Sequence, residues 1–138
     1  MEAVAPYSWA IIALLVFVLV TLVMSALVGA RKASAKLTAG GTPDNNYEDA
    51  LYRMNRSHQN AVENAALIAI ALAAAIVTGV SPWWTNLLMG LFLLFRLLHT
   101  FILVQNIGGE VQSLRTFAYV ASWACNVVLA IMAIVALM

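Results

Sequence analysis

Charged residues are scarce in this chain, and their scarcity excludes an ordinary soluble domain. Only 9% of the 138 residues are Asp, Glu, Lys or Arg, whereas 64% are hydrophobic. Soluble domains contain about a quarter charged residues and about half apolar ones. The net charge of +1 supplies no basic surface, so we expect no nucleic-acid partner. A lipid bilayer is the environment that this composition indicates.

Cysteine is almost absent, which removes two further possibilities. Cys125 lies in an apolar run and has no second cysteine in the chain with which to form a disulfide or a thiolate metal site. The two histidines, His58 and His99, have no local pair of carboxylates, so we expect no metal site. Basic residues are also missing from the N-terminal flank. The first apolar run is too long for a signal peptide, and we expect it to be a retained span.

Four long apolar runs dominate what is present. They cover about residues 7–30, 65–80, 83–104 and 117–138. A helical span needs roughly 20 residues, and helices satisfy their own backbone polar groups in lipid. The sequence therefore predicts an all-α integral membrane four-helix bundle that forms one domain over residues 1–138. The expected helices cover about residues 7–31, 47–79, 82–106 and 112–138.

The second apolar run is too short to cross a bilayer alone, since residues 65–80 number only 16. Its helix must extend back into the polar segment 47–64. Part of a polar helix then lies at membrane depth, where it must face protein or water. Breaker residues mark the expected connections, at Gly40-Gly41, at 79–82 and at 106–109.

Basic residues gather at one end of the expected bundle. They follow the first helix and open the second and the fourth, as Arg31, Lys32, Lys36, Arg53, Arg56 and Arg115. The turn at 79–85 and the terminal segments carry no Lys or Arg. Because basic loops stay in the cytoplasm, we expect this end to be cytoplasmic and both termini to be non-cytoplasmic. The short loops and the lack of a retention signal favour a bacterial inner membrane.

Polar side chains recur at helical spacing near the basic end. The sets are Arg53, Arg56, Asn60 and Glu63 on the second helix, Arg96 and His99 on the third, and Arg115, Thr116 and Tyr119 on the fourth. Residues three and four apart share a helical face, and ionisable residues within a membrane are usually functional. The surplus of arginine over one acid indicates a missing anionic partner, and the arginine fork suits carboxylates. A structural network is the alternative, with Arg56 paired to Glu63.

Three short motifs cover this polar pattern in order. Residues 56–64, RSHQNAVEN, fit R-x-x-x-N-x-x-E, residues 96–100, RLLHT, fit R-x-x-H-T, and residues 115–119, RTFAY, fit R-[ST]-x-x-Y. Together they resemble the signature of the membrane-associated proteins in eicosanoid and glutathione metabolism, the MAPEG family. The similarity extends over nearly the whole chain.

This resemblance implies an enzyme of the glutathione S-transferase type. It implies a homotrimer in which glutathione, the co-substrate, lies between neighbouring subunits and attacks lipophilic electrophiles from the bilayer as a transferase or peroxidase. Arg115 matches the family's catalytic arginine, which would favour the thiolate. The glutathione-binding positions that the resemblance implies are Arg31, Arg56, Asn60, Glu63, His99, Thr116 and Tyr119.

One position departs from the family pattern and leaves two alternatives open. Mammalian members have a tyrosine four residues after the R-x-x-H-T histidine, whereas this chain has Leu103. A catalytically inactive scaffold of the same fold is therefore one alternative. A small four-helix transporter with Glu63 as its intramembrane acid is the other, although such exporters place their acid in the first helix, and residues 7–30 are uncharged here.

The charge asymmetry generates a test of topology. Reporter fusions at Met138 and at Gly41 should give opposite signals, because an even number of spans puts both termini on the side opposite the basic loop. The measurement is the activity of paired periplasmic and cytoplasmic reporters. Matching signals at the two positions would contradict the four-span arrangement.

Overall fold

The computed structural model describes residues 2–38, 40–108 and 113–138, whose regular structure is entirely helical. A short 3-10 helix, η1 (Glu2–Tyr7), leads into the four long helices α1 (Ser8–Ser34), α2 (Ala50–Val77), α3 (Pro82–Val104) and α4 (Ser113–Val135). All four are long and apolar enough to cross a bilayer. The prediction of an all-α chain with four helices long and apolar enough to span a membrane is confirmed over the described residues.

The helix ends differ from the expected ones by a few residues, for local reasons. α2 begins at Ala50 rather than at position 47, because the Asp49 side chain accepts a hydrogen bond of 2.9 Å from the Leu51 amide and caps the helix there. Gly79, at φ +73°, turns the chain after α2, and Pro82 opens α3. Gly109 and the expected helix start at position 112 lie outside the described residues.

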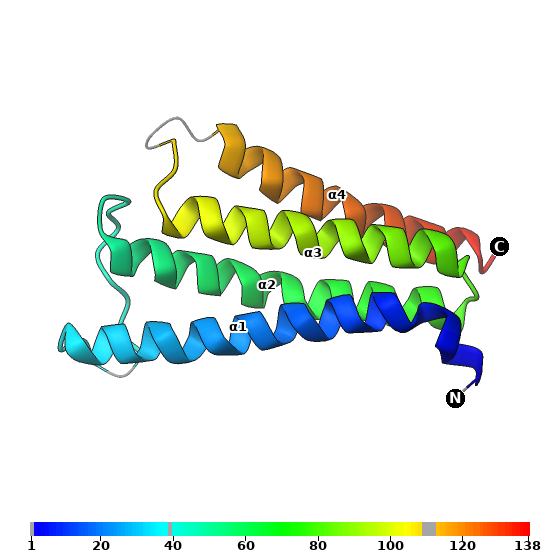
Figure 1. Ribbon diagram of the computed structural model, residues 1–138, viewed down its shortest axis with the longest axis horizontal. Coiled ribbons are helices and arrows are strands. Elements are labelled where there is room, and N and C mark those ends of the chain that lie inside the picture. The colour runs from blue at the N-terminus through cyan, green and yellow to red at the C-terminus, as the bar shows by residue number, and fades with distance from the viewer. Residues whose placement is uncertain (1, 39, 109–112) are drawn as a thin grey trace.

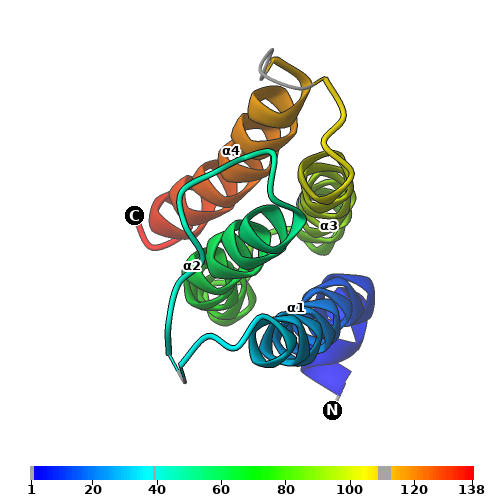
Figure 2. The same cartoon turned by 90° about the vertical axis from the view of Figure 1, so that its left-hand side faces the viewer.

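The helices run side by side, and both termini lie at the end opposite the α1–α2 loop (Figure 1). Viewed along the bundle, α1 and α4 lie on opposite sides of the α2–α3 pair (Figure 2). We call the end that holds the α1–α2 loop the basic end, because the six basic residues of the sequence pattern lie at or near it. α3 packs against each of the other three helices, so its side chains reach both sides of the bundle.

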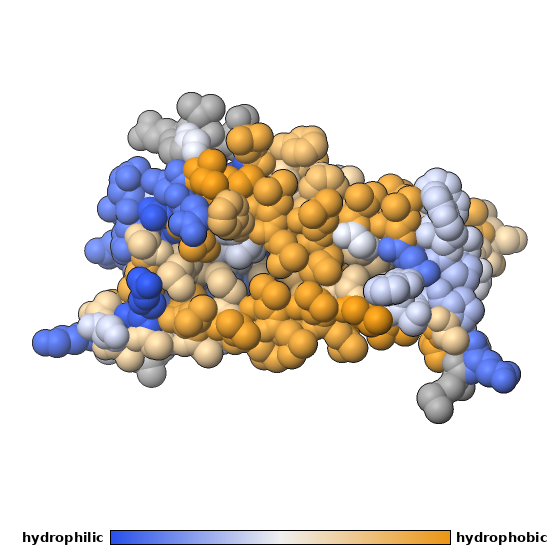
Figure 3. All heavy atoms as spheres, in the orientation of Figure 1, coloured by the Kyte–Doolittle hydropathy of each residue, from blue (hydrophilic) through white to orange (hydrophobic). Residues whose placement is uncertain are grey.

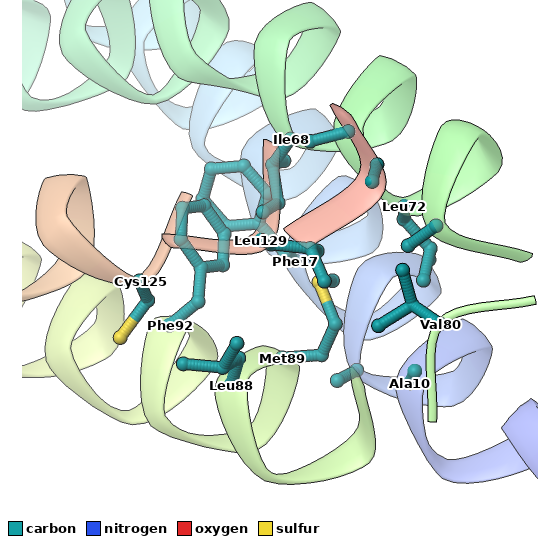
Figure 4. Close-up of a cluster of buried hydrophobic side chains, with 14 of the residues drawn as sticks. Ala10, Phe17, Ile68, Leu72, Val80, Leu88, Met89, Phe92, Cys125 and Leu129 are labelled. Carbon is teal, nitrogen blue, oxygen red and sulfur yellow. The ribbon is translucent and has the colours of Figure 1, made fainter. Parts of the chain in front are cut away.

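Most of the buried apolar cluster lies in the half of the bundle nearest the termini. Figure 4 shows part of this cluster. Phe17 of α1 meets Phe92 of α3 edge to face, with ring centroids 5.2 Å apart. Ile68 of α2, Met89 of α3 and Leu129 of α4 are fully buried around this pair. The half at the basic end combines buried apolar side chains, such as Met54 and Ile102, with buried polar ones such as Arg96 and His99.

The outer surface of the bundle is apolar over its middle. Large side chains such as Leu19, Ile70 and Ile131 are more than half exposed, and Figure 3 shows a hydrophobic band between two more hydrophilic ends. A surface of this kind is stable against lipid or against another apolar surface, and not against water.

Three hydrogen bonds connect the N-terminal segment to the start of α3 and to the turn before it. Asn86 accepts from the Ala10 amide at 2.9 Å and donates to the Pro6 carbonyl at 2.8 Å. The Tyr7 hydroxyl donates to the Val80 carbonyl at 2.6 Å. Asn86 therefore caps α1 from another helix, since no side chain at the start of α1 does so.

Removing the two hydrogen bonds of Asn86 should destabilise the bundle. Asn86→Ala leaves two backbone groups without partners and should lower the free energy of unfolding by about 1–2 kcal/mol, seen as a fall of a few degrees in the thermal midpoint in detergent. Asn45→Ala, the same change in the exposed loop, is the control and should leave the midpoint unchanged. An equal effect of the two substitutions would contradict the role of Asn86.

Candidate functional site

A polar hollow of about 240 Å³ lies near the basic end. Its walls come from α2, α3, α4 and the residue run just before α2. The lining residues are Tyr47, Arg56, Asn60, Glu63, His99, Leu103, Arg115, Thr116 and Tyr119. Segments up to about 70 positions apart in the sequence thus contribute to one site.

Seven of the eight site residues predicted from the sequence line this hollow, and Arg31 does not. Arg31 lies in the exposed last turn of α1. Leu103 lines the hollow, so the position where mammalian family members carry a tyrosine faces the site and presents an apolar wall. Arg53 shares a helix with Arg56 and Glu63 but is not among the lining residues.

The α2 wall carries one cation, one acid and one amide. Arg56 and Glu63 approach to 3.6 Å, with side chains 41% and 59% exposed. An ion pair this exposed contributes roughly 0–1 kcal/mol, so a ligand can replace it at little cost. Asn60 lies between them on the same face and is half-buried.

α3 carries the most deeply buried charge of the described residues, next to the hollow but not in its lining. Arg96 is only 2% exposed, and its Nη2 donates to the backbone carbonyl of Asn60 at 3.0 Å and to the Asn60 Oδ1 at 2.6 Å. Its guanidinium lies 5.9 Å from the Phe17 ring centroid and 5.7 Å from that of Tyr119. Within the described ranges, the Arg56–Glu63 pair is the only ion pair, so Arg96 has no carboxylate partner there.

His99 lies one turn further along α3 and lines the hollow. Its ring centroid lies 5.8 Å from that of Tyr119, and its Nδ1 is buried without a hydrogen-bond partner among the described residues. Tyr119 thus contacts both Arg96 and His99 while its own side chain lines the hollow. Arg96 and His99 thus lie deeper in the bundle than the exposed groups of α2 and α4.

Tyr47 is a lining residue that the sequence pattern did not identify. The Arg115 guanidinium lies 4.7 Å from the centroid of its ring, within the range of a cation–π contact. Tyr52 packs edge to face against the same ring, with centroids 5.0 Å apart. No spacing rule relates a loop residue to an arginine on another helix, which is why the contact could not be found from the sequence.

Arg53 fixes the loop segment that bears Tyr47. Its Nη1 donates to the carbonyls of Tyr47 at 2.6 Å and Glu48 at 2.8 Å, and its Nε donates to the Val104 carbonyl at 3.3 Å. The side chain therefore ties the loop to the ends of α2 and α3. Arg53 supports the site from outside and does not offer its charge to the hollow.

A second hollow of about 540 Å³ adjoins the first at the loop side. The two share Tyr47 and Arg56 in their linings, and the second adds neutral polar residues such as Asn45, Asn55 and Gln59. A third hollow of about 410 Å³ lies between α2 and α4 in the half near the termini, and its lining is almost entirely apolar. Only the first combines several cations with an acid.

The fold and the site together define a class of protein, an integral membrane four-helix protein with a cation-rich polar site at one end of an apolar bundle. The chain belongs to the MAPEG family, whose profile it matches over residues 10–135. This family includes glutathione transferases and related membrane proteins. No curated protein matches the chain in sequence.

Proposed function

We propose that the chain is a glutathione-dependent membrane transferase or peroxidase, with the hollow beside Arg115 as its glutathione site. The observation that carries the proposal is that Arg56, Glu63 and Arg115 line one hollow. Glutathione has two carboxylates, one ammonium group and one thiol. Its surplus of negative charge matches a site with more arginines than acids.

The hollow offers one carboxylate and the ammonium group of the ligand a partner of opposite sign. Arg56 binds a carboxylate, which the arginine fork can hold with two parallel hydrogen bonds. Glu63 binds the ammonium group and gives up its weak contact with Arg56 to do so. Thr116 and Tyr119 offer hydroxyl groups to the tripeptide backbone. His99 lies at the floor of the same hollow.

Arg115 acts on the thiol. A free thiol of pKa about 8.5 is mostly protonated at neutral pH, and a neighbouring cation lowers that pKa by stabilising the thiolate. The cation–π contact with Tyr47 holds the guanidinium at the edge of the hollow. The thiolate sulfur then forms a bond with an electrophilic carbon, from which a halide leaves, or opens an epoxide whose oxygen takes a proton from water.

The electrophile arrives from the bilayer. Leu103 supplies an apolar wall inside the hollow, and Phe117, next to the site on α4, is more than half exposed on the outer surface. A lipophilic substrate could therefore reach the sulfur without crossing the polar loops. The positive-inside rule puts the basic end, and hence the entry of glutathione, on the cytoplasmic side.

The position of Arg31 supports the homotrimer that the family resemblance implies. Arg31 lies outside the hollow of its own chain, on an exposed turn of α1. The apolar faces of all four helices remain largely exposed. In a trimer, Arg31 would contribute to the hollow of a neighbouring subunit, where it would add another cation for the ligand's carboxylates.

The chemical assignment is tested by separating binding from turnover. Arg115→Leu should raise the pH at which the ultraviolet absorbance of bound thiolate appears, since about 1.4 kcal/mol of lost stabilisation equals one pKa unit. It should lower kcat with an aryl halide by about tenfold or more and change the glutathione dissociation constant less. Glu63→Gln should do the reverse and mainly weaken binding.

The outcomes of this experiment distinguish the alternatives. Lys36→Met, which removes a cation from the loop, is the control and should change neither quantity. If Arg115→Leu leaves the thiolate absorbance and the rate unchanged, the assignment of Arg115 is wrong. Wild-type protein that binds glutathione but shows neither thiolate nor turnover would be a scaffold, and absence of binding would reject the glutathione site itself.

The assembly has its own test. Native mass spectrometry in mild detergents should give three copies of the chain, because the family resemblance implies a trimer and Arg31 can contribute to a hollow only in a neighbouring subunit. Arg31→Met should leave the trimer intact and weaken glutathione binding. Monomers or dimers across several detergents would contradict the trimer.

A further inference from the structure

We propose that Arg96 is a positioning residue that orients the carboxamide of Asn60, so that Asn60 presents only N–H donors to the hollow. The part of the ligand that meets Asn60 must then be a hydrogen-bond acceptor, the oxygen of a carbonyl or carboxylate group. This inference deepens the proposed function and rests on it for the identity of the ligand. Arg96 itself lies beneath the hollow and is not among its lining residues.

The chemistry of arginine fixes which way the amide faces. A guanidinium has five N–H donors and no acceptor, so the Asn60 side-chain atom 2.6 Å from Arg96 Nη2 must be the oxygen. The Nδ2 group then points away from Arg96. Among the residues that the structure describes, no group accepts a hydrogen bond from Nδ2, and Asn60 lines the hollow. Its two N–H bonds are therefore left for a ligand.

Several contacts hold the Arg96 guanidinium in place, so that it can orient the Asn60 carboxamide. The two hydrogens of its Nη2 go to two oxygens of the same residue, the carbonyl of Asn60 and its Oδ1. The guanidinium lies between the rings of Phe17 and Tyr119, each less than 6 Å away. This geometry fixes both the backbone and the side chain of Asn60 relative to α3.

Stability alone does not account for an arginine at this position. Its Nε and Nη1 are buried without partners, and no carboxylate pairs with it within the described residues. Burying an uncompensated charge is costly, and replacing such groups by apolar ones of similar size is often neutral or stabilising. Among the contacts of Arg96, the hydrogen bond to the Asn60 Oδ1 is the one that determines what a lining side chain presents to the hollow, and an apolar residue could not make it.

A thermodynamic cycle tests the proposal. Arg96→Met, in detergent-purified trimer, should retain or raise the thermal midpoint while weakening glutathione binding by about tenfold and raising KM more than it lowers kcat. Asn60→Ala should weaken binding by a similar factor. In the Asn60→Ala background, Arg96→Met should then have no further effect, because Arg96 acts through Asn60. Lys36→Met is the matched loss of a cation and should change nothing.

The results that overturn the proposal are specific. If Arg96→Met weakens binding equally with and without Asn60, Arg96 contacts the ligand itself. If Arg96→Met leaves glutathione binding unchanged, the orientation of Asn60 does not affect binding and the proposal is wrong. Should Arg96→Met fail to fold, Arg96→Gln replaces it in the same cycle, because a glutamine carboxamide has both donors and an acceptor and so does not dictate which way the Asn60 amide faces.

A second cycle needs no ligand, so failure of the proposed function can be told apart from failure of this inference. Asn60→Asp gives Arg96 a carboxylate partner and should raise the thermal midpoint. The same substitution in the Arg96→Met background leaves a half-buried carboxylate without that cation and should lower the midpoint. Equal effects in both backgrounds would refute the contact on which the inference rests, even if wild-type protein did not bind glutathione.

Discussion

The constraint that organises this molecule is that hydrocarbon offers no partner to a polar group. The four helices satisfy their own backbones, but Arg56, Asn60, Glu63 and Arg96 lie on helices that cross the membrane and must find partners inside the bundle. The apolar core lies mainly in the half near the termini, around Phe17 and Phe92. The remaining half can therefore be polar, and a hollow forms where its side chains do not fill the space.

The polar wall of α2 was predictable because helical periodicity is a local property. Spacings of three and four place Asn60 and Glu63 on the same face as Arg56, whatever the rest of the chain does. The convergence of α2, α3 and α4 on one hollow could be predicted only by resemblance to a family, since periodicity does not say how faces of different helices meet. Asp49 caps α2, so the helix begins three residues later than the hydrophobic pattern predicts.

Three other residues show where sequence reasoning fails. Tyr47 joins the site through a cation–π contact with Arg115, across a loop whose path depends on Arg53. Arg53 has the right helical spacing for the hollow, but the carbonyls of the loop and of Val104 bind its guanidinium instead. Arg31 has the right sequence context, yet a single chain does not bring it to the hollow. Backbone carbonyls are partners that a linear pattern cannot show.

The division of the arginines follows from their burial. Arg56 and Arg115 keep part of their surface exposed, so each can exchange a weak protein contact for an ionic group of a ligand. Arg96 cannot do so, because its donors are directed at Asn60 or enclosed by the bundle. A cation at the surface of a hollow selects the charge of what binds. A cation beneath the hollow acts through the group to which it is hydrogen-bonded. In its proposed role, Arg96 thus determines that a ligand meets the N–H donors of the Asn60 carboxamide and not its oxygen.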